Sequence, residues 1–214
     1  MQWIYYFMAH RIPFYVYKIP KNDCFIYTED NQLNKTAIVL HGSLLMIKIF
    51  TNQEQLCLAI LRANSIIDIK KNNAKIKVHY YYKVIALDEV WLMTFKSNEA
   101  FINSPIIIKS LTASYNITLL HYEMMNNILT HKEAKNRILQ LLVYLAEQFG
   151  YTKNNYTIIK FRITQSNIAL IIGTNKITVN KILKMLKKDA LIKYSKNKIM
   201  QIYSHAILKK IISK

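Results

Sequence analysis

Residues 163–184 read ITQSNIALIIGTNKITVNKILK, and the spacing within this stretch is typical of a helix-turn-helix. When Gln165 is counted as position one, Ala169 falls at position five, Gly173 at nine and Val179 at fifteen. The small Ala169 lets the second helix cross close to the first, and Gly173 permits the positive φ that turns the chain. Apolar residues at three- and four-residue steps give each helix one buried face. These further apolar residues are Ile168, Ile172 and Ile182.

The outward positions of this stretch carry side chains that reach base edges and phosphates. A plain αα-hairpin in a helical core is the alternative, but the spacing and the cationic outer face occur together, which favours a DNA-binding module. The residues expected to contact DNA, with two from a downstream turn, are Gln165, Ser166, Thr174, Asn175, Lys176, Ile177, Thr178, Asn180, Lys181, Lys184, Lys196 and Lys198.

The positive charge is concentrated in the same part of the chain. The formal net charge is +18, and residues 131–214 carry 17 Lys+Arg against 3 Asp+Glu, whereas residues 1–130 carry 13 against 9. A basic block that coincides with a helix-turn-helix is typical of a polyanion binder. A codon bias towards lysine would distribute lysine along the whole chain. It does not explain why Asp and Glu are scarce in the last third.

Residues 23–95 predict short strands separated by turns, and residues 1–20, with their two prolines, predict an irregular lead-in. β-Branched and aromatic residues dominate the strand region, so we expect an antiparallel sandwich or jelly roll. The expected strands are residues 37–40, 44–50, 56–61, 79–87 and 90–95, with a tight turn at 41–43. The basic stretch at 70–77 is either a solvated loop or an effector loop.

After Pro105 apolar residues alternate at steps of three and four, which predicts a long dimerisation helix over 105–130. The alternative is a helix packed on its own domain. The expected seam consists of Ile108, Leu111, Tyr115, Thr118, Tyr122, Met125 and Leu129, with Thr118 setting the register. A second amphipathic helix is expected over 132–149, ended by Gly150.

Downstream of the helix-turn-helix, residues 191–194 and 199–203 flank a polar turn at 195–198 and predict a hairpin, which makes the last domain a winged helix. Ser204 is expected to cap a closing helix over 206–212. The predicted organisation is α+β: a β-roll effector-type domain over 1–104, the dimerisation helix over 105–130 and the winged helix-turn-helix over 131–214.

Other classes of function lack support in the sequence. No apolar run is long enough to span a bilayer, so no membrane association is expected. Cys24 and Cys57 are too few for a disulfide framework and fit no zinc motif. No phosphate loop, nucleophile-and-base signature or metal-spaced carboxylate pair is present, so we expect neither an enzyme nor a metal site.

A β-roll, a long helix and a C-terminal winged helix, in that order, resemble the CRP/FNR family of bacterial transcription regulators. Within it the chain is similar to the NtcA group of global nitrogen regulators of cyanobacteria and red-algal plastids. The residues that carry the resemblance are 61–65 (LRANS), 122–125 (YEMM), 129–132 (LTHK), 148–150 (QFG) and the whole helix-turn-helix. It covers residues 37 to 214 and implies a cyclic-nucleotide-binding-like β-roll and a homodimer on two-fold symmetric double-stranded DNA, with RNA polymerase as a partner.

The resemblance also assigns roles to residues of the helix-turn-helix. Lys176 and Lys181 stand where the family has base-reading arginines, and Thr178 matches a phosphate- or base-contacting threonine. Lysine keeps the positive charge but lacks the planar guanidinium group that makes two hydrogen bonds to guanine. Discrimination between bases should therefore be weaker. Ile177 is closer to the valine of the NtcA group than to the glutamate of catabolite regulators.

The effector pocket implied by the resemblance, which holds 2-oxoglutarate in the NtcA group, departs from the family pattern. Asp68 stands where the family has a glycine, His79 aligns with an arginine, and Thr118 replaces an arginine of the dimer helix. Asp68 would repel a dicarboxylate. The candidate effector residues are Asp68, Ile69, Lys70, Lys71, His79, Thr118 and Glu123. We expect a degenerate or altered pocket, with 2-oxoglutarate as its candidate ligand.

The sequence thus predicts a dimeric, sequence-specific DNA-binding regulator, with nitrogen-related genes as its targets. The alternative is a non-specific nucleic-acid-binding protein, nucleoid or RNA-associated, that kept the winged helix. The many residues with AT-rich codons and the resemblance to plastid proteins favour a plastid stroma as the compartment. A bacterial cytoplasm is the alternative.

Overall fold

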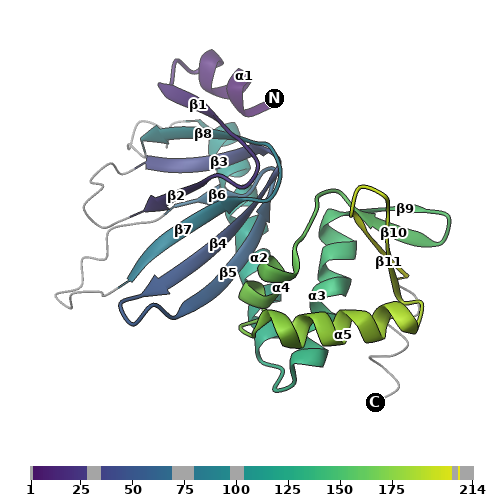
Figure 1. Cartoon of the computed structure of the whole chain (residues 1–214). Helices are drawn as coiled ribbons and strands as arrows, with labels where there is room; N and C mark the ends of the chain where they lie inside the picture. Colours follow the sequence, from purple (N-terminus) through teal and green to yellow (C-terminus); the bar gives the residue numbers. More distant parts are fainter. Residues whose placement is uncertain (1, 28–34, 69–79, 97–103, 204–206, 208–214) are drawn as a thin grey trace. The chain divides into compact units, whose positions relative to one another are not determined.

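The computed structural model describes residues 2–27, 35–68, 80–96, 104–203 and 207. The chain divides into two compact units, Met1–Glu123 and Met124–Lys214. Each unit has its own sheets and its own buried apolar residues (Figure 1).

The first unit contains two antiparallel sheets of four strands each, in the orders β1-β8-β3-β6 and β2-β7-β4-β5 (Figure 1). The bounds of its strands are β1 Phe14–Ile19, β2 Cys24–Tyr27, β3 Lys35–His41, β4 Ser43–Phe50, β5 Gln55–Arg62, β6 Ile66–Ile67, β7 Tyr80–Ala86 and β8 Val90–Lys96. Each strand expected from the sequence is present, and β1, β2 and β6 are additional.

The core of this β-roll lies between the two sheets. Alternate residues of β3 and β8 face alternate residues of β4, β5 and β7, because successive side chains of a strand point to opposite faces. The core residues are Ala37, Val39, Leu44, Met46, Ala59, Leu61, Ile67, Val84, Ala86, Val90 and Leu92. The tight turn at Gly42 has φ +86°, and a Cβ there would lie 2.3 Å from the Glu89 carbonyl oxygen. This turn lets the chain pass directly from β3 in one sheet to β4 in the other.

The expectation of an irregular lead-in over residues 1–20 is wrong. Helix α1 spans Gln2–Ala9 and buries Trp3 and Phe7 in a second apolar cluster on the outside of the first sheet. Strand β1 pairs with β8 over its whole length. Both prolines stand outside these elements, which is why they do not prevent the helix or the strand.

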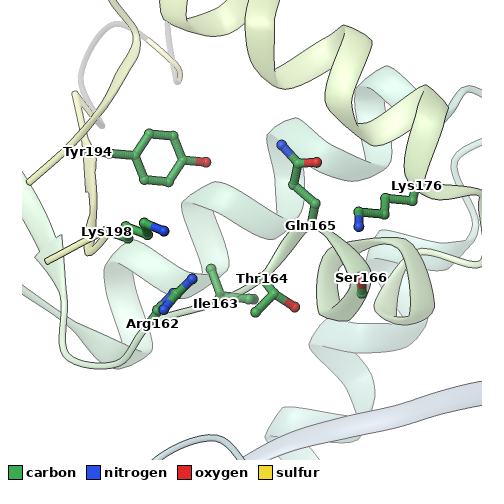
Figure 2. A pocket seen from close by; sticks show the side chains of 8 residues that line it. All are labelled: Arg162, Ile163, Thr164, Gln165, Ser166, Lys176, Tyr194 and Lys198. Atoms are coloured by element: carbon green, nitrogen blue, oxygen red, sulfur yellow. The ribbon is translucent and has the colours of Figure 1, made fainter.

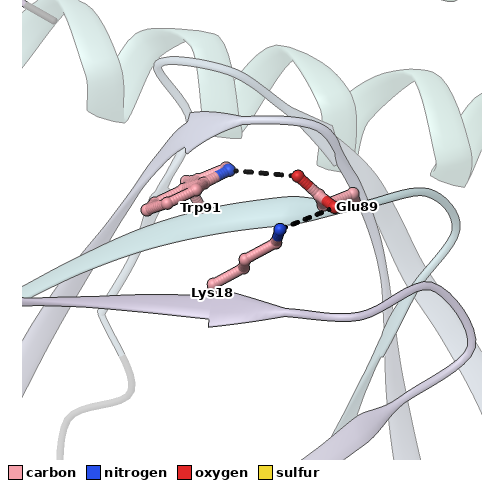
Figure 3. A network of polar contacts seen from close by, with 3 residues as sticks. All are labelled: Lys18, Glu89 and Trp91. Atoms are coloured by element: carbon pink, nitrogen blue, oxygen red, sulfur yellow. Dashed lines mark hydrogen bonds and ion pairs between the residues drawn. The ribbon is translucent and has the colours of Figure 1, made fainter.

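Strand β1 is also tied to the β8 side of the roll by side chains (Figure 3). The Lys18 Nζ lies 3.0 Å from a Glu89 carboxylate oxygen and 5.6 Å from the centre of the Trp91 ring. The indole Nε1 of Trp91 donates to the other Glu89 oxygen at 3.4 Å. The hydrogen bond from Lys18 is the largest cause that lowers the pKa of Glu89. Because these groups are exposed, the pair contributes little to stability.

Helix α2 spans Pro105–Leu129 and buries one of its faces on its own chain. Thr118 is inside: its Oγ1 accepts from the Ile66 backbone N–H at 2.8 Å and lies 2.9 Å from the Ile66 carbonyl oxygen. Thr118 therefore makes its hydrogen bonds within its own chain, and its place in a dimer seam stays a prediction. Met125 is fully buried and Leu111 packs on the α1 cluster.

The residues predicted to form one seam of α2 therefore lie on two faces of the helix, one packed and one exposed. Of these residues, Leu111 packs on the apolar cluster of α1, Tyr122 packs on the core of the roll, and Met125 is buried. Ile108 and Tyr115 remain exposed, and Leu119, one residue after Thr118, is 64% exposed. The exposed apolar residues of α2 are Ile106, Ile108, Tyr115, Leu119 and Leu120.

The second unit packs α3, which spans Ala134–Phe149, against an antiparallel sheet in the order β11-β12-β10-β9. Its strands are β9 Gly150–Lys153, β10 Tyr156–Ile159, β11 Ile192–Tyr194 and β12 Met200–Ile202, and the helix-turn-helix consists of α4 Gln165–Ile171 and α5 Lys176–Lys188. The expected wing hairpin is β11 with β12. The closing helix expected over 206–212 lies outside the described residues, apart from a helical Ile207.

Gly150 ends α3 as expected, but not through a left-handed conformation. Its φ is −100° and ψ is 166°, which any residue adopts. A Cβ at this position would instead lie 2.3 Å from Thr157 Cγ2 and 2.5 Å from the Ala146 carbonyl oxygen. Glycine is required here because β10 crosses the end of the helix too closely for a side chain.

The predicted fold class, an antiparallel β-roll, a long helix and a C-terminal winged helix-turn-helix, is confirmed. None of the helices in the described ranges is both long and apolar enough to cross a membrane.

Candidate nucleic-acid interface

Both helices of the helix-turn-helix begin at a side-chain cap. Thr164 accepts from the Asn167 N–H at 3.0 Å at the start of α4, and Asn175 accepts from the Thr178 N–H at 2.8 Å at the start of α5. Such caps satisfy backbone donors that have no partner within the helix. The two helix starts are therefore fixed locally by the sequence.

The turn between the helices is held from outside as well as from within. Gly173 has φ +63°, as expected, and the nearest atom to a Cβ there would be 3.7 Å away. The Arg137 Nη1 on α3 donates to the Ile172 carbonyl oxygen at 2.6 Å, and its Nη2 donates to the Lys132 carbonyl oxygen at 3.3 Å. Arg137 thus joins the end of α4 to the start of α3, a role that the sequence pattern did not reveal.

The exposed face of α5 combines lysines with one apolar side chain. Val179, Leu183 and Leu186 are buried beneath the helix. On the opposite side Ile177 is 82% exposed, and Lys176, Lys181 and Lys184 are also exposed. An isoleucine this exposed gains nothing from the fold, whereas apolar side chains on a recognition helix contact thymine methyl groups.

An open pocket of about 370 Å³ lies beside the start of α4, between α5 and the wing (Figure 2). Lys198 and Arg162 lie on one side of it and Lys176 on the other. The residues that line it are Arg162, Ile163, Thr164, Gln165, Ser166, Lys176, Tyr194 and Lys198. Three cationic side chains around an open pocket attract a phosphate backbone.

The wing brings its turn lysines to this region. The turn is closed by the Lys198 N–H, which donates to the Ser195 carbonyl oxygen at 2.9 Å. Lys198 has φ +58° and lines the pocket, while Lys196 is exposed on the same turn. Arg162 and Tyr194 were missed from the sequence, because they lie outside the helix-turn-helix itself and line its pocket only through the fold.

Some of the predicted DNA-binding residues have roles within the fold. Asn175 is the cap of α5, and the Gln165 Nε2 donates to the Asn180 Oδ1 at 3.3 Å, which joins the two helices. Ser166 is exposed and lines the pocket, and Thr174 and Thr178 are half-buried. The exposed members that remain free to meet a ligand through their side chains are therefore chiefly the lysines, Ser166 and Ile177.

The candidate effector residues are only partly described, since Ile69, Lys70, Lys71 and His79 lie outside the described residues. Asp68 accepts from the Tyr115 Oη at 2.6 Å and from the Thr36 Oγ1 at 3.4 Å. Desolvation, and then the bond to Asp68, raise the pKa of Tyr115. Thr118 is bonded to Ile66, as described above, and Glu123 is exposed. Asp68 and Thr118 thus both join the roll to α2.

Comparison with known proteins agrees with this architecture. Residues 136–211 match the model of the Crp-like helix-turn-helix domain. The protein ycf28 of Porphyra purpurea, described as an HTH-type transcriptional regulator, is 24% identical over 204 residues, which cover 92% of this chain and 82% of the relative. The global nitrogen regulator of Synechococcus elongatus is 22% identical over 177 residues, 81% of this chain and 80% of the relative.

The fold is also that of solved structures. A transcriptional regulator of the CRP/FNR family from Thermus thermophilus is similar with a TM-score of 0.67 at 17% identity, over 94% of this chain and 99% of that one. A β-roll followed by a long helix and a winged helix with a cationic recognition face defines a class of DNA-binding regulator. Residues 136–211 of this chain are thus similar to Crp-like helix-turn-helix domains, and the chain as a whole is similar to global nitrogen regulators and has the fold of a CRP/FNR-type regulator.

Proposed function

We propose that this protein is a homodimeric, sequence-specific transcription regulator that reads a two-fold symmetric site on double-stranded DNA. The observation that carries the proposal is the face of α5, where Ile177 stands exposed among Lys176, Lys181 and Lys184. A purely non-specific binder needs the lysines alone, whereas an exposed apolar side chain at the same place favours contact with base edges.

The exposed face of α2 supports dimerisation. Ile108, Tyr115 and Leu119 follow one another at steps of seven and four residues, which places them on one stripe of the helix. Ile106 and Leu120 are also exposed, but at 100° per residue they lie about 100° or more round the helix from this stripe. A second copy of the same helix covers such a stripe, and two recognition helices then reach half-sites about one DNA turn apart.

The contacts of Asp68 and Thr118 support an altered effector pocket. Both side chains hold α2 against the roll by hydrogen bonds within the chain. The Asp68 carboxyl group is a poor partner for a dicarboxylate such as 2-oxoglutarate. We therefore propose that 2-oxoglutarate has at most a weak effect on DNA binding by this protein.

The test is fluorescence anisotropy on a palindromic duplex of the GTA/TAC type and on scrambled DNA of the same composition, at fixed salt, with and without 2-oxoglutarate. A specific regulator should prefer the palindrome by about 10³-fold or more. Equal affinity for both duplexes would leave a non-specific nucleic-acid binder, and a large response to 2-oxoglutarate would contradict the altered pocket.

RNA polymerase is the proposed protein partner, and nitrogen-related genes are the proposed targets. The plastid stroma is the proposed compartment, on the similarity to the Porphyra purpurea protein.

A further inference from the structure

The sheet of the second unit has an exposed face that the proposed function does not use. The register aligns Ile158 with Gln201 and with Tyr151, and Gln201 with Lys193, so these side chains share one face. Thr157, Ile192 and Ile202 are on the other face and are buried. The outer sheet patch, as we call this face, consists of Tyr151, Lys153, Tyr156, Ile158, Lys193, Gln201 and Tyr203.

Aromatic rings and cations alternate on this patch. The rings of Tyr156 and Tyr203 are 5.5 Å apart at their centres, with an angle of 41° between their planes. The Lys193 Nζ lies 3.6 Å from the centre of the Tyr156 ring. Tyr151, on β9, is 50% exposed. Tyr151 and Tyr203 are therefore accessible to a ligand on this face.

The charge of the patch restricts what that ligand is. Lys153 and Lys193 belong to it, and none of its seven residues is acidic. The three acids of residues 131–214 are Glu133, Glu147 and Asp189, which stand before α3, within α3 and after α5. A surface with lysines and no carboxylate complements an anion, and its tyrosines require that the anion also presents flat apolar faces.

We propose that the outer sheet patch binds single-stranded nucleic acid, with bases stacked on Tyr151 and on Tyr203 and phosphates held by Lys153 and Lys193. Four-stranded sheets with exposed aromatic rings bind single strands in this way, because every base has a face that stacks. Duplex DNA is a poor ligand for the rings, since its base faces are already stacked within the helix.

The patch is separate from the pocket described above. Successive residues of β11 point to opposite faces, so Tyr194 lines the pocket beside α4 while Lys193 lies over Tyr156 on the patch. The wing hairpin therefore stands between the two surfaces. A duplex in the pocket and a single strand on the patch are expected to bind at the same time.

The experiment measures the anisotropy of a fluorescein-labelled 12-nucleotide oligothymidylate with the full-length protein at fixed salt. Tyr151→Ala and Tyr203→Ala are each expected to weaken binding about tenfold, which corresponds to the loss of one stacked base. Tyr194→Ala is the matched control, because Tyr194 is 38% exposed and Tyr203 is 37% exposed, on opposite faces of one hairpin. Lys193→Gln is expected to lower the slope of log affinity against log salt by about 0.7.

Two further arms identify the ligand chemistry and the surface. A 12-mer of abasic sites has the same phosphates without bases and is expected to bind at least tenfold more weakly than the oligothymidylate. An excess of unlabelled palindromic duplex is expected to leave the labelled strand bound. The proposal is overturned if the oligothymidylate does not bind, if the abasic strand binds equally, if Tyr194→Ala acts like Tyr203→Ala, or if the duplex displaces the strand.

Because duplex affinity of the same variants is measured in parallel, failure of this proposal is distinguishable from failure of the proposed function. Tyr151→Ala and Tyr203→Ala should leave the preference for the palindrome unchanged.

Discussion

Helices α2 and α5 both expose apolar side chains, but the exposed side chains that surround them differ in chemistry. Around Leu119 the exposed neighbours on the same side of α2 are Tyr115, Asn116 and Glu123, and none of them is cationic. Around Ile177 the exposed neighbours on α5 are lysines. A largely apolar stripe without cations fits another protein surface, whereas an isolated apolar side chain among cations fits the groove of a polyanion.

The two helices also differ in what they bury. Helix α5 buries apolar side chains alone, while α2 buries Ser114, Thr118 and His121. The buried polar groups of α2 need partners in the roll, so its orientation on the roll is specified by hydrogen bonds. This difference between the helices can be tested at single residues.

The largest effect is expected from Leu119→Glu on α2. A carboxylate at the centre of the apolar stripe would have to be desolvated in the dimer, so the dissociation constant of the dimer should rise by at least about 100-fold. Sedimentation velocity measures the change. Ala113→Glu is the control and should stay dimeric, because the exposed Ala113 lies about 120° round the same helix from Leu119. If Leu119→Glu remains a dimer, the stripe is not the interface.

The double variant Lys176→Ala/Lys181→Ala on α5 should weaken binding to the palindrome by about 30- to 100-fold, since each lysine supplies a phosphate or base contact. Lys187→Ala, in the last turn of the same helix, is the control and should retain most of the affinity. Equal losses in the variant and the control would mean that general charge, and not the recognition face, determines binding.

Thr118→Val tests the polar seam between α2 and the roll. The valine fits the space but leaves the Ile66 N–H without its acceptor in a buried site, which should cost about 1–3 kcal/mol of unfolding free energy. Urea unfolding followed by circular dichroism measures it. Thr118→Ser keeps the hydroxyl and should recover most of the loss, whereas an equally unstable serine variant would assign the effect to the methyl group.

His121 predicts a dependence on pH. Burial, and then the charge of Arg62, lower the pKa of His121 to about 4 from its ordinary 6.5. The unfolded chain therefore binds a proton more readily, and stability present above pH 6.5 is lost as pH falls towards 4. Between pH 7 and pH 5 the loss should be about 1–2 kcal/mol. His121→Gln should flatten this part of the stability curve, and an unchanged slope would contradict the assignment.

Ile177→Ala is expected to have the smallest effect. Removing the apolar tip should weaken binding to the palindrome by about tenfold or less and leave scrambled DNA unaffected, because only base contacts are lost. Ile108→Ala on α2 should leave both affinities for DNA unchanged at concentrations where the protein is dimeric. A uniform loss on all DNA with Ile177→Ala would contradict a base-reading role.

Most of the helix-turn-helix was predictable from the sequence because its determinants are local. Asn175 and Thr164 cap the helices within three residues, and Gly173 adopts the left-handed turn that its lack of Cβ permits. The N-terminal segment was not predictable in the same way. Strand β1 exists because β8, far along the chain, pairs with it, and α1 is held by an apolar cluster drawn from several strands.

The heptad pattern of α2 shows the same limit. The sequence shows that one stripe of this helix is apolar. It does not show whether a second copy or the protein's own roll covers that stripe. In the structure Thr118 is hydrogen-bonded to Ile66 of β6, and Leu111 packs on the apolar cluster of α1. The exposed stripe instead includes Leu119.

By itself the sequence determined the order of β-roll, long helix and helix-turn-helix, together with the wing and the position of the basic block, since these follow from spacing, capping and charge along the chain. The tertiary structure alone decided which face of α2 is free, why Gly150 is glycine, and that Arg137, Arg162 and Tyr194 belong to the helix-turn-helix and its pocket. The reason is physical: burial and close approach depend on residues distant in sequence, and no local pattern records which of them meet.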